Sequence, residues 1–93
     1  MNTQMQASTK GEVLLRAERT AIDGMTVDYR FLRSAEGQYS MQIDCEGRSE
    51  RLQSYTDEFL LAEALYLLAK EERLLPGTLG ELWQDLWAMH ATQ

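Results

Sequence analysis

Apolar and polar residues alternate along the first half of the chain, in two segments at residues 25–32 and 39–46. A period of two with aromatic and β-branched side chains is typical of strands that bury one face. Acidic-glycine pairs at residues 23–24, 36–37 and 46–47 mark turns around these segments. The side chains predicted to share the buried face are Met25, Val27, Tyr29, Phe31, Tyr39, Met41, Ile43 and Cys45.

Turn chemistry predicts how the two segments pair. A three-residue loop ending at Gly37, in the left-handed conformation, places Phe31 opposite Met41 and Val27 opposite Cys45. Both pairs bring apolar side chains to one face. An antiparallel hairpin of these two strands is therefore expected, because register follows from burying one face.

The turn at Asp23-Gly24 admits two registers with the segment before it. A three-residue loop places Ala17 opposite Tyr29 and puts Leu15 on the same face. A two-residue loop is the alternative, and it would mix polar with apolar positions. We expect the three-residue loop, because it keeps the apolar face continuous.

Residues 48–54 are polar, with Leu52 as the one apolar side chain. The segment suits a short edge strand, on which charged residues discourage aggregation, or a loop. The sequence leaves both readings open. The sheet is accordingly predicted to have three or four strands.

After residue 55 the period changes to that of a helix. Thr56 is a suitable N-cap, and the helix is predicted to continue to about Arg73. Between residues 59 and 69 every position except Glu63 is apolar, alanine or tyrosine. A helix that is apolar nearly all round requires cover on more than one side.

Pro76 ends that helix, and Thr78 with Glu81 forms a capping-box pattern for a second one, running to about His90. The short connection predicts an antiparallel helical hairpin. The fold class expected is α+β, an antiparallel three- to four-stranded β-meander followed by an α-helical hairpin packed on one sheet face. The second helix has an apolar face made of Leu79, Leu82, Trp83, Leu86 and Met89.

The 93 residues suffice for one core, so we expect a single α+β domain over residues 12–91 after a loose N-terminus at residues 1–11. The N-terminal residues lack the basic and apolar regions of a secretory signal. The longest apolar stretch falls short of the roughly 20 residues that span a bilayer. A cytoplasmic location is expected.

Charge and residue types argue against several functions. The net charge is −6, and residues 56–93 carry two basic and seven acidic side chains, a balance that disfavours nucleic-acid binding. Cys45 and His90 are the single cysteine and histidine, too few for a structural zinc site. His90 lies near the end of the last helix, where the helix dipole favours a cation, which explains this histidine without a catalytic triad. No catalytic residue, metal or cofactor is predicted, and we do not expect an enzyme.

Three aromatic residues are the candidates for a partner-binding surface. Trp83 and Trp87 lie one helical turn apart and form a ridge, and the first helix adds Tyr66. The sequence leaves open whether the two tryptophans seal the core or face solvent. The function we expect is a non-enzymatic protein-protein interaction or regulatory module that self-associates through its helices, for example as a homodimer. The alternative is a small-molecule pocket between sheet and helices, lined by Tyr29, Tyr39, Tyr66 and Trp83.

Residues 76–87, PGTLGELWQDLW, resemble the end of a family of short Firmicutes proteins of unknown function. Those proteins close with proline, two variable residues, leucine, a variable residue, an acid, two apolar residues, a polar residue, aspartate and two apolar residues. The helix start at residues 56–58 and the strand at 39–43 are also similar, so that the resemblance covers about residues 25–87. This chain differs in placing tryptophans where the family has smaller apolar residues. The resemblance implies a bacterial cytoplasmic module and no particular activity.

Overall fold

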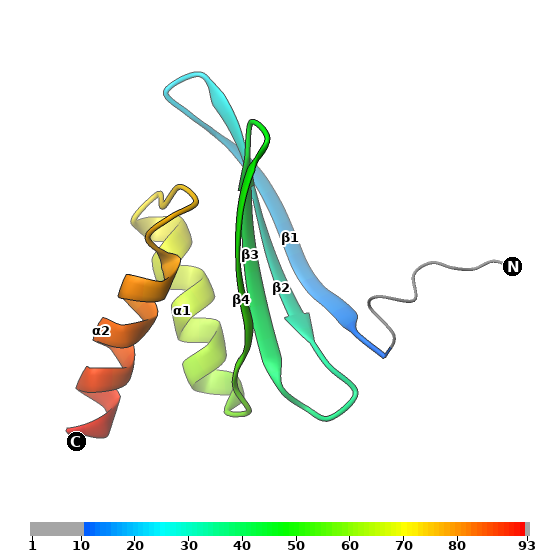
Figure 1. Ribbon diagram of the computed structural model, residues 1–93, viewed down its shortest axis with the longest axis vertical. Helices are drawn as coiled ribbons and strands as arrows, with labels where there is room; N and C mark the ends of the chain where they lie inside the picture. Colours follow the sequence, from blue (N-terminus) through cyan, green and yellow to red (C-terminus); the bar gives the residue numbers. More distant parts are fainter. Residues whose placement is uncertain (1–10, 93) are drawn as a thin grey trace, which may run out of the picture.

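The computed structural model describes residues 11–92, and Figure 1 shows its arrangement. Four antiparallel strands form one sheet in the order of the chain, and two helices pack on one of its faces. This is the α+β fold that the sequence predicts. Of the predicted loose N-terminus, residues 1–10 lie outside the described part of the chain. The elements are β1 (Val13–Ile22), β2 (Met25–Arg33), β3 (Tyr39–Cys45), β4 (Arg48–Thr56), α1 (Phe59–Glu71) and α2 (Leu79–Ala91).

The hairpin of β2 and β3 has the predicted register, with Phe31 opposite Met41 and Val27 opposite Cys45. Gly37 closes its turn in the left-handed region, at a φ of 84° that glycine adopts without steric cost. The shared face of these two strands is buried beneath the helices. This prediction is confirmed because loop geometry and burial demand the same register.

The predicted register of β1 with β2 is wrong. Ile22 pairs with Met25 across a two-residue turn, in which Asp23 and Gly24 both have positive φ, at 51° and 81°. This is the mirror-image turn whose twist matches that of the flanking strands. Glu18, not Ala17, therefore lies opposite Tyr29.

The adopted register places charged side chains of β1 on the side of the sheet that faces the helices. Arg16 lies opposite Phe31, and α1 supplies partners for these charges. Arg16 contacts Glu63 at 3.4 Å, and Lys70 forms an ion pair with Glu18. The turn thus takes its favoured geometry because the mixed face of β1 is neutralised from α1.

Residues 48–56 form a strand, so the sheet has four strands. Leu52 lies opposite Met41 and is half-buried. The ladder is irregular near Ser54, whose φ is 49°, and there the Ser54 amide donates to the Ser40 hydroxyl at 2.8 Å. The polar composition that left this segment ambiguous reflects a strand whose other face meets solvent.

The predicted N-cap of the first helix is wrong, whereas that of the second helix is at the predicted residue but lacks the capping-box hydrogen bond. α1 begins at Phe59 with Glu58 as N-cap, and the Thr56 hydroxyl accepts from the Glu58 amide at 3.2 Å instead of capping the helix. α1 ends at Glu71, before the predicted Arg73. Thr78 is the N-cap of α2, but its side chain makes no cap hydrogen bond.

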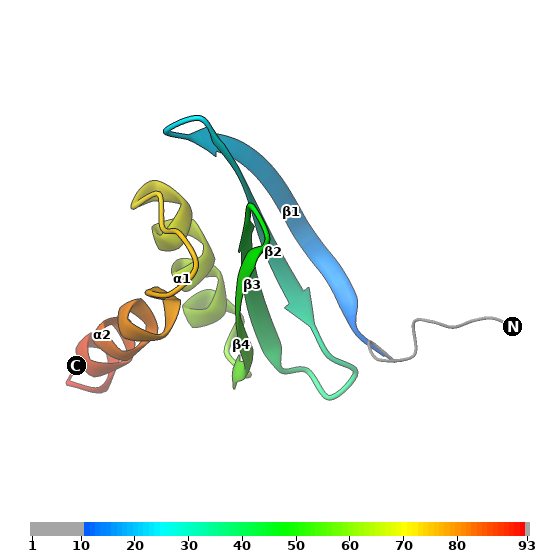
Figure 2. The same cartoon turned by 45° about the horizontal axis from the view of Figure 1, so that its top comes forward.

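The core lies between the sheet and α1. α1 lies over β2, β3 and β4, and α2 packs beside it against β4, while β1 extends beyond the helices (Figures 1 and 2). Within residues 11–92 no helix is both long and apolar enough to cross a membrane. The most deeply buried large apolar side chains are Val27, Tyr29, Phe31, Met41, Ile43, Leu65, Tyr66 and Leu79.

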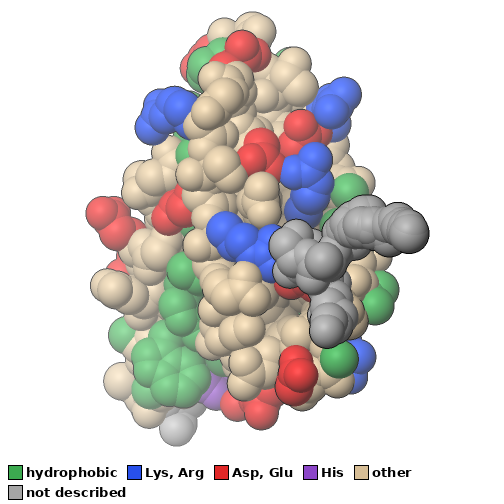
Figure 3. All heavy atoms as spheres, turned by 45° about the vertical axis from the view of Figure 1, so that its right-hand side comes forward, with side chains coloured by type: hydrophobic (Ala, Val, Ile, Leu, Met, Phe, Trp, Pro, Cys, Tyr) green, Lys and Arg blue, Asp and Glu red, His purple; other side chains and the backbone are tan. Residues whose placement is uncertain are grey.

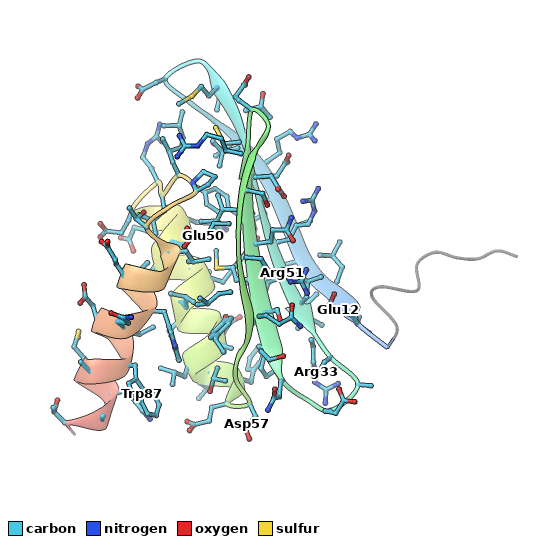
Figure 4. All side chains as sticks on the ribbon, viewed as in Figure 1. Glu12, Arg33, Glu50, Arg51, Asp57 and Trp87 are labelled. Atoms are coloured by element: carbon cyan, nitrogen blue, oxygen red, sulfur yellow. The ribbon has the colours of Figure 1, made fainter. Side chains whose placement is uncertain are left out.

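The sheet face opposite the helices is polar. Its arginines alternate with carboxylates, so that charges on neighbouring strands compensate each other rather than pooling. Figure 4 shows Arg51 and Glu12 lying toward each other across this face. The ion pairs are Arg19–Asp28, Arg30–Asp44 and Arg51–Glu12.

Candidate interaction surface

Tyr66 lies fully inside the core. Its ring stacks on Phe31 with centroids 5.4 Å apart, and the charged groups of Arg16 and Lys70 lie 5.3 and 5.2 Å from its centroid. Its hydroxyl is buried without a hydrogen-bond partner among the described residues. Burial, together with the nearby charge of Glu18, raises the pKa of Tyr66 to about 12. This predicted site residue is therefore out of reach of a partner in the folded chain.

Trp83 is half-buried and joins α2 to the sheet. Its ring meets the ring of Tyr55 edge-on, with centroids 4.9 Å apart. The Tyr55 hydroxyl donates to the Ala62 carbonyl at 2.8 Å, and burial raises the pKa of Tyr55. These contacts hold Trp83 against β4 at the edge of the core, so that its role is largely structural packing.

Trp87 faces solvent next to Trp83. The two indole rings are 6.0 Å apart, and the His90 ring lies 5.7 Å from Trp87 on the other side. His90 in turn approaches the carboxylate of Glu58, at the start of α1, with 3.8 Å between Nε2 and Oε1. Trp87 is thus held in a row of rings while almost half of its surface stays exposed.

The start of α1 and the end of α2 lie at the same end of the helical hairpin, as the approach of His90 to Glu58 requires (Figure 1). Figure 3 shows a hydrophobic patch beside the only histidine. We call the four large apolar side chains at this end the hairpin tip. They are Phe59, Leu60, Trp87 and Met89, exposed by 45%, 78%, 48% and 62%.

The sequence pointed to part of this tip. The sequence makes Trp87 a candidate and leaves open whether it faces solvent, and the apolar circumference of α1 indicates a face without cover. Met89, which the sequence assigns to the apolar face of the second helix, is exposed instead, and the sequence does not mark Leu60 as exposed. Helical periodicity alone does not show which apolar positions the sheet leaves uncovered. The sequence does not single out Phe59, because its ring lies partly in the core and partly in solvent, with its centroid 5.8 Å from that of the buried Tyr39 ring.

The side chains predicted to line a small-molecule pocket are spread through the core. Tyr29 and Tyr39 are buried, and the Tyr29 hydroxyl donates to the Leu74 carbonyl at 2.9 Å. A recess of about 280 Å³ includes Tyr29 of the four predicted residues. Its lining is otherwise charged or polar and consists of Glu18, Arg19, Thr20, Lys70 and Arg73. The small-molecule alternative stays a prediction.

The groups that could bind metals are dispersed. Cys45 is buried, and its sulfur lies 3.9 Å from that of Met25. In the described part of the chain no three side chains among His, Cys, Asp and Glu gather as a metal site would require.

Comparison with protein-family models, curated proteins and solved structures finds no match to this chain. The resemblance to the Firmicutes family therefore stays a prediction. The fold and the surface described above define a small α+β protein with an apolar tip on its helical hairpin.

Proposed function

We propose that the chain is a non-enzymatic protein-protein interaction module that self-associates through the hairpin tip. The observation that carries the proposal is the gathering of Phe59, Leu60, Trp87 and Met89, all substantially exposed, at one end of the helices. A hydrophobic patch such as the one that Figure 3 shows beside His90 is typical of an interaction site on a small protein. The cytoplasmic location and the absence of catalysis predicted from the sequence are part of this proposal.

The tip has the composition of an interface centre. Tryptophan is enriched among residues that dominate binding energy, and Trp87 is already restrained between Trp83 and His90. A restrained ring loses little conformational entropy on binding. Burying Leu60 or Met89 completely would contribute up to about 1.5–3 kcal/mol each.

A second copy is the partner that we propose, because a two-fold contact can pack the tip of one copy against the same tip of the other. In such a contact the same patch faces itself, so that exposed apolar side chains of the tip gain cover in both copies. Asp57 and Glu58 directly precede α1, and Figure 4 shows Asp57 at that end of the helix. Like charges on the two copies repel, and self-association should therefore strengthen with salt.

Light scattering coupled to size-exclusion chromatography tests the proposal. The average mass of the wild type should rise with protein concentration, and Leu60→Glu should lower it at equal concentration. Gln84→Glu is the matched control, because it adds the same charge at an exposed position of α2 and removes no apolar group. Equal masses for the wild type and Leu60→Glu at every concentration would contradict the proposal.

A further inference from the structure

β1 is the longest strand of the sheet, yet almost all of its side chains are at least partly exposed. Of its ten residues, Ile22 alone is buried. It pairs with β2 along one edge, and within residues 11–92 no strand pairs with its other edge. Figures 1 and 2 show β1 outside the cover of the helices.

The register with β2 determines which backbone groups face the free edge. Hydrogen-bonded and non-hydrogen-bonded pairs alternate along an antiparallel ladder, and the pair that closes a two-residue turn, here Ile22 and Met25, is hydrogen-bonded. The alternation directs the N–H and C=O groups of Ala17, Arg19 and Ala21 away from β2. These groups form a ready template for another strand.

The free strand also carries an apolar run. Val13, Leu14 and Leu15 follow one another at its start, and each is more than a third exposed. Edge strands of soluble proteins usually carry charges or proline at such positions. Here the first three residues are aliphatic, which favours burial against another chain.

We infer that the free edge of β1 pairs antiparallel with β1 of a second copy, with the two-fold axis at Ala17. In this register Arg16 of each copy lies opposite Glu18 of the other, on the face that already holds these charges. Opposite charges directly across two strands are stabilising. The contact is separate from the hairpin tip and does not depend on it.

Charge excludes the neighbouring registers. Moving the axis to Glu18 or to Arg16 sets two like charges directly opposite each other, and moving it to Arg19 does the same on the outer face. A parallel arrangement also brings like residues side by side. The charges of β1 therefore favour the register centred on Ala17 and disfavour the neighbouring ones. The bulge between Leu14 and Arg16 marks where the regular ladder ends.

Cysteine cross-linking tests the register. Ala17→Cys places two thiols across the axis, where paired Cα atoms are about 5.5 Å apart and within reach of a disulfide. Arg19→Cys and Ala21→Cys are matched controls, since both are exposed on the same face but lie away from the axis. Under mild oxidation the covalent dimer should form about tenfold faster with Ala17→Cys than with either control, reflecting a high effective concentration. The same difference in rate should be found when each cysteine substitution is combined with Leu60→Glu.

Equal rates at the three positions, or a faster reaction at residue 19 or 21, would overturn the inference. Hydrogen exchange of the wild type supplies a second readout that needs no substitution. The amide of Ala17 should become more protected as the protein concentration rises. Protection that is unchanged with concentration would overturn the inference even if every cysteine variant misfolds. Failure of both readouts leaves the hairpin tip unaffected, because neither readout involves α1 or α2.

Discussion

The carboxylate of Glu50, on β4, accepts a hydrogen bond of 2.9 Å from the backbone amide of Leu79, the first residue of α2. The same carboxylate accepts from the amides of Gly77 at 2.6 Å and Gly80 at 3.1 Å. An acid at this position satisfies amides that the helix leaves unpaired and interacts favourably with the helix dipole. Figure 4 shows Glu50 between β4 and the start of α2. A strand side chain thus fixes where α2 begins.

Replacing this carboxylate should loosen α2. Glu50→Ala leaves three amides without their acceptor, and the free energy of unfolding should fall by about 1–3 kcal/mol. Glu81→Ala, which removes the acid of the capping-box pattern, should cost about 0.5 kcal/mol or less. Urea denaturation followed by circular dichroism measures both. Equal losses would show that Glu50 is not the principal cap.

Two tyrosine hydroxyls should respond in opposite ways to removal. The Tyr66 hydroxyl is buried without a partner, so Tyr66→Phe should leave the free energy of unfolding unchanged or raise it by up to about 1 kcal/mol. The Tyr29 hydroxyl donates to Leu74, and Tyr29→Phe should cost about 1 kcal/mol. Thermal melts of the two variants compare them directly. A clear loss in Tyr66→Phe would mean that its hydroxyl has a partner.

Stability should decline at alkaline pH. Burial holds the pKa of Tyr66 at about 12 in the folded chain, above its ordinary value of 10.0. A raised pKa stabilises the folded state fully below pH 10, and this contribution is lost as the pH rises from 10 towards 12. The free energy of unfolding should fall by up to about 1.4 kcal/mol per pH unit from this residue. In Tyr66→Phe the free energy of unfolding should fall less steeply between pH 10 and 12. An equally steep fall in this variant would show that Tyr66 is not responsible for it.

The two tryptophans should differ in their contribution to stability. Trp83 packs on Tyr55, and Trp83→Ala should cost about 2–3 kcal/mol. Trp87 is almost half exposed, and Trp87→Ala should cost less than about 1 kcal/mol while weakening self-association. Urea denaturation followed by circular dichroism gives the first comparison and light scattering the second. A loss for Trp87→Ala as large as that for Trp83→Ala would place Trp87 in the core.

The sequence predicts the strands where local turn chemistry and burial agree. Gly37 and the apolar alternation lead to one register for β2 with β3, and the structure has it. At Asp23 the two criteria conflict, and the turn geometry determines the register. The conflict is resolved by Glu63 and Lys70 on α1, which form ion pairs with the charged side chains of β1 although they are 40 or more residues away in the sequence. No local pattern contains that information.

The caps and the tip show the same dependence on distant residues. Thr78 has the sequence of an N-cap, yet the amides near it are bound by Glu50 from another element. The apolar excess of α1 was visible in the sequence, whereas the exposure of Leu60 depends on which face the sheet covers. Helical periodicity shows that α1 has more apolar side chains than one face can hold. The packing of α1 on the sheet and beside α2 determines which of them stay exposed.

Tryptophan fluorescence on dilution tests the central claim, that the hairpin tip self-associates, most directly. Both tryptophans lie on α2, so that their emission reports on the tip and not on β1. The emission of the wild type and of Gln84→Glu should shift to longer wavelength on dilution, as Trp87 returns to water, whereas the emission of Leu60→Glu should not change. A wild-type spectrum that is identical from high micromolar to nanomolar concentration would contradict the account.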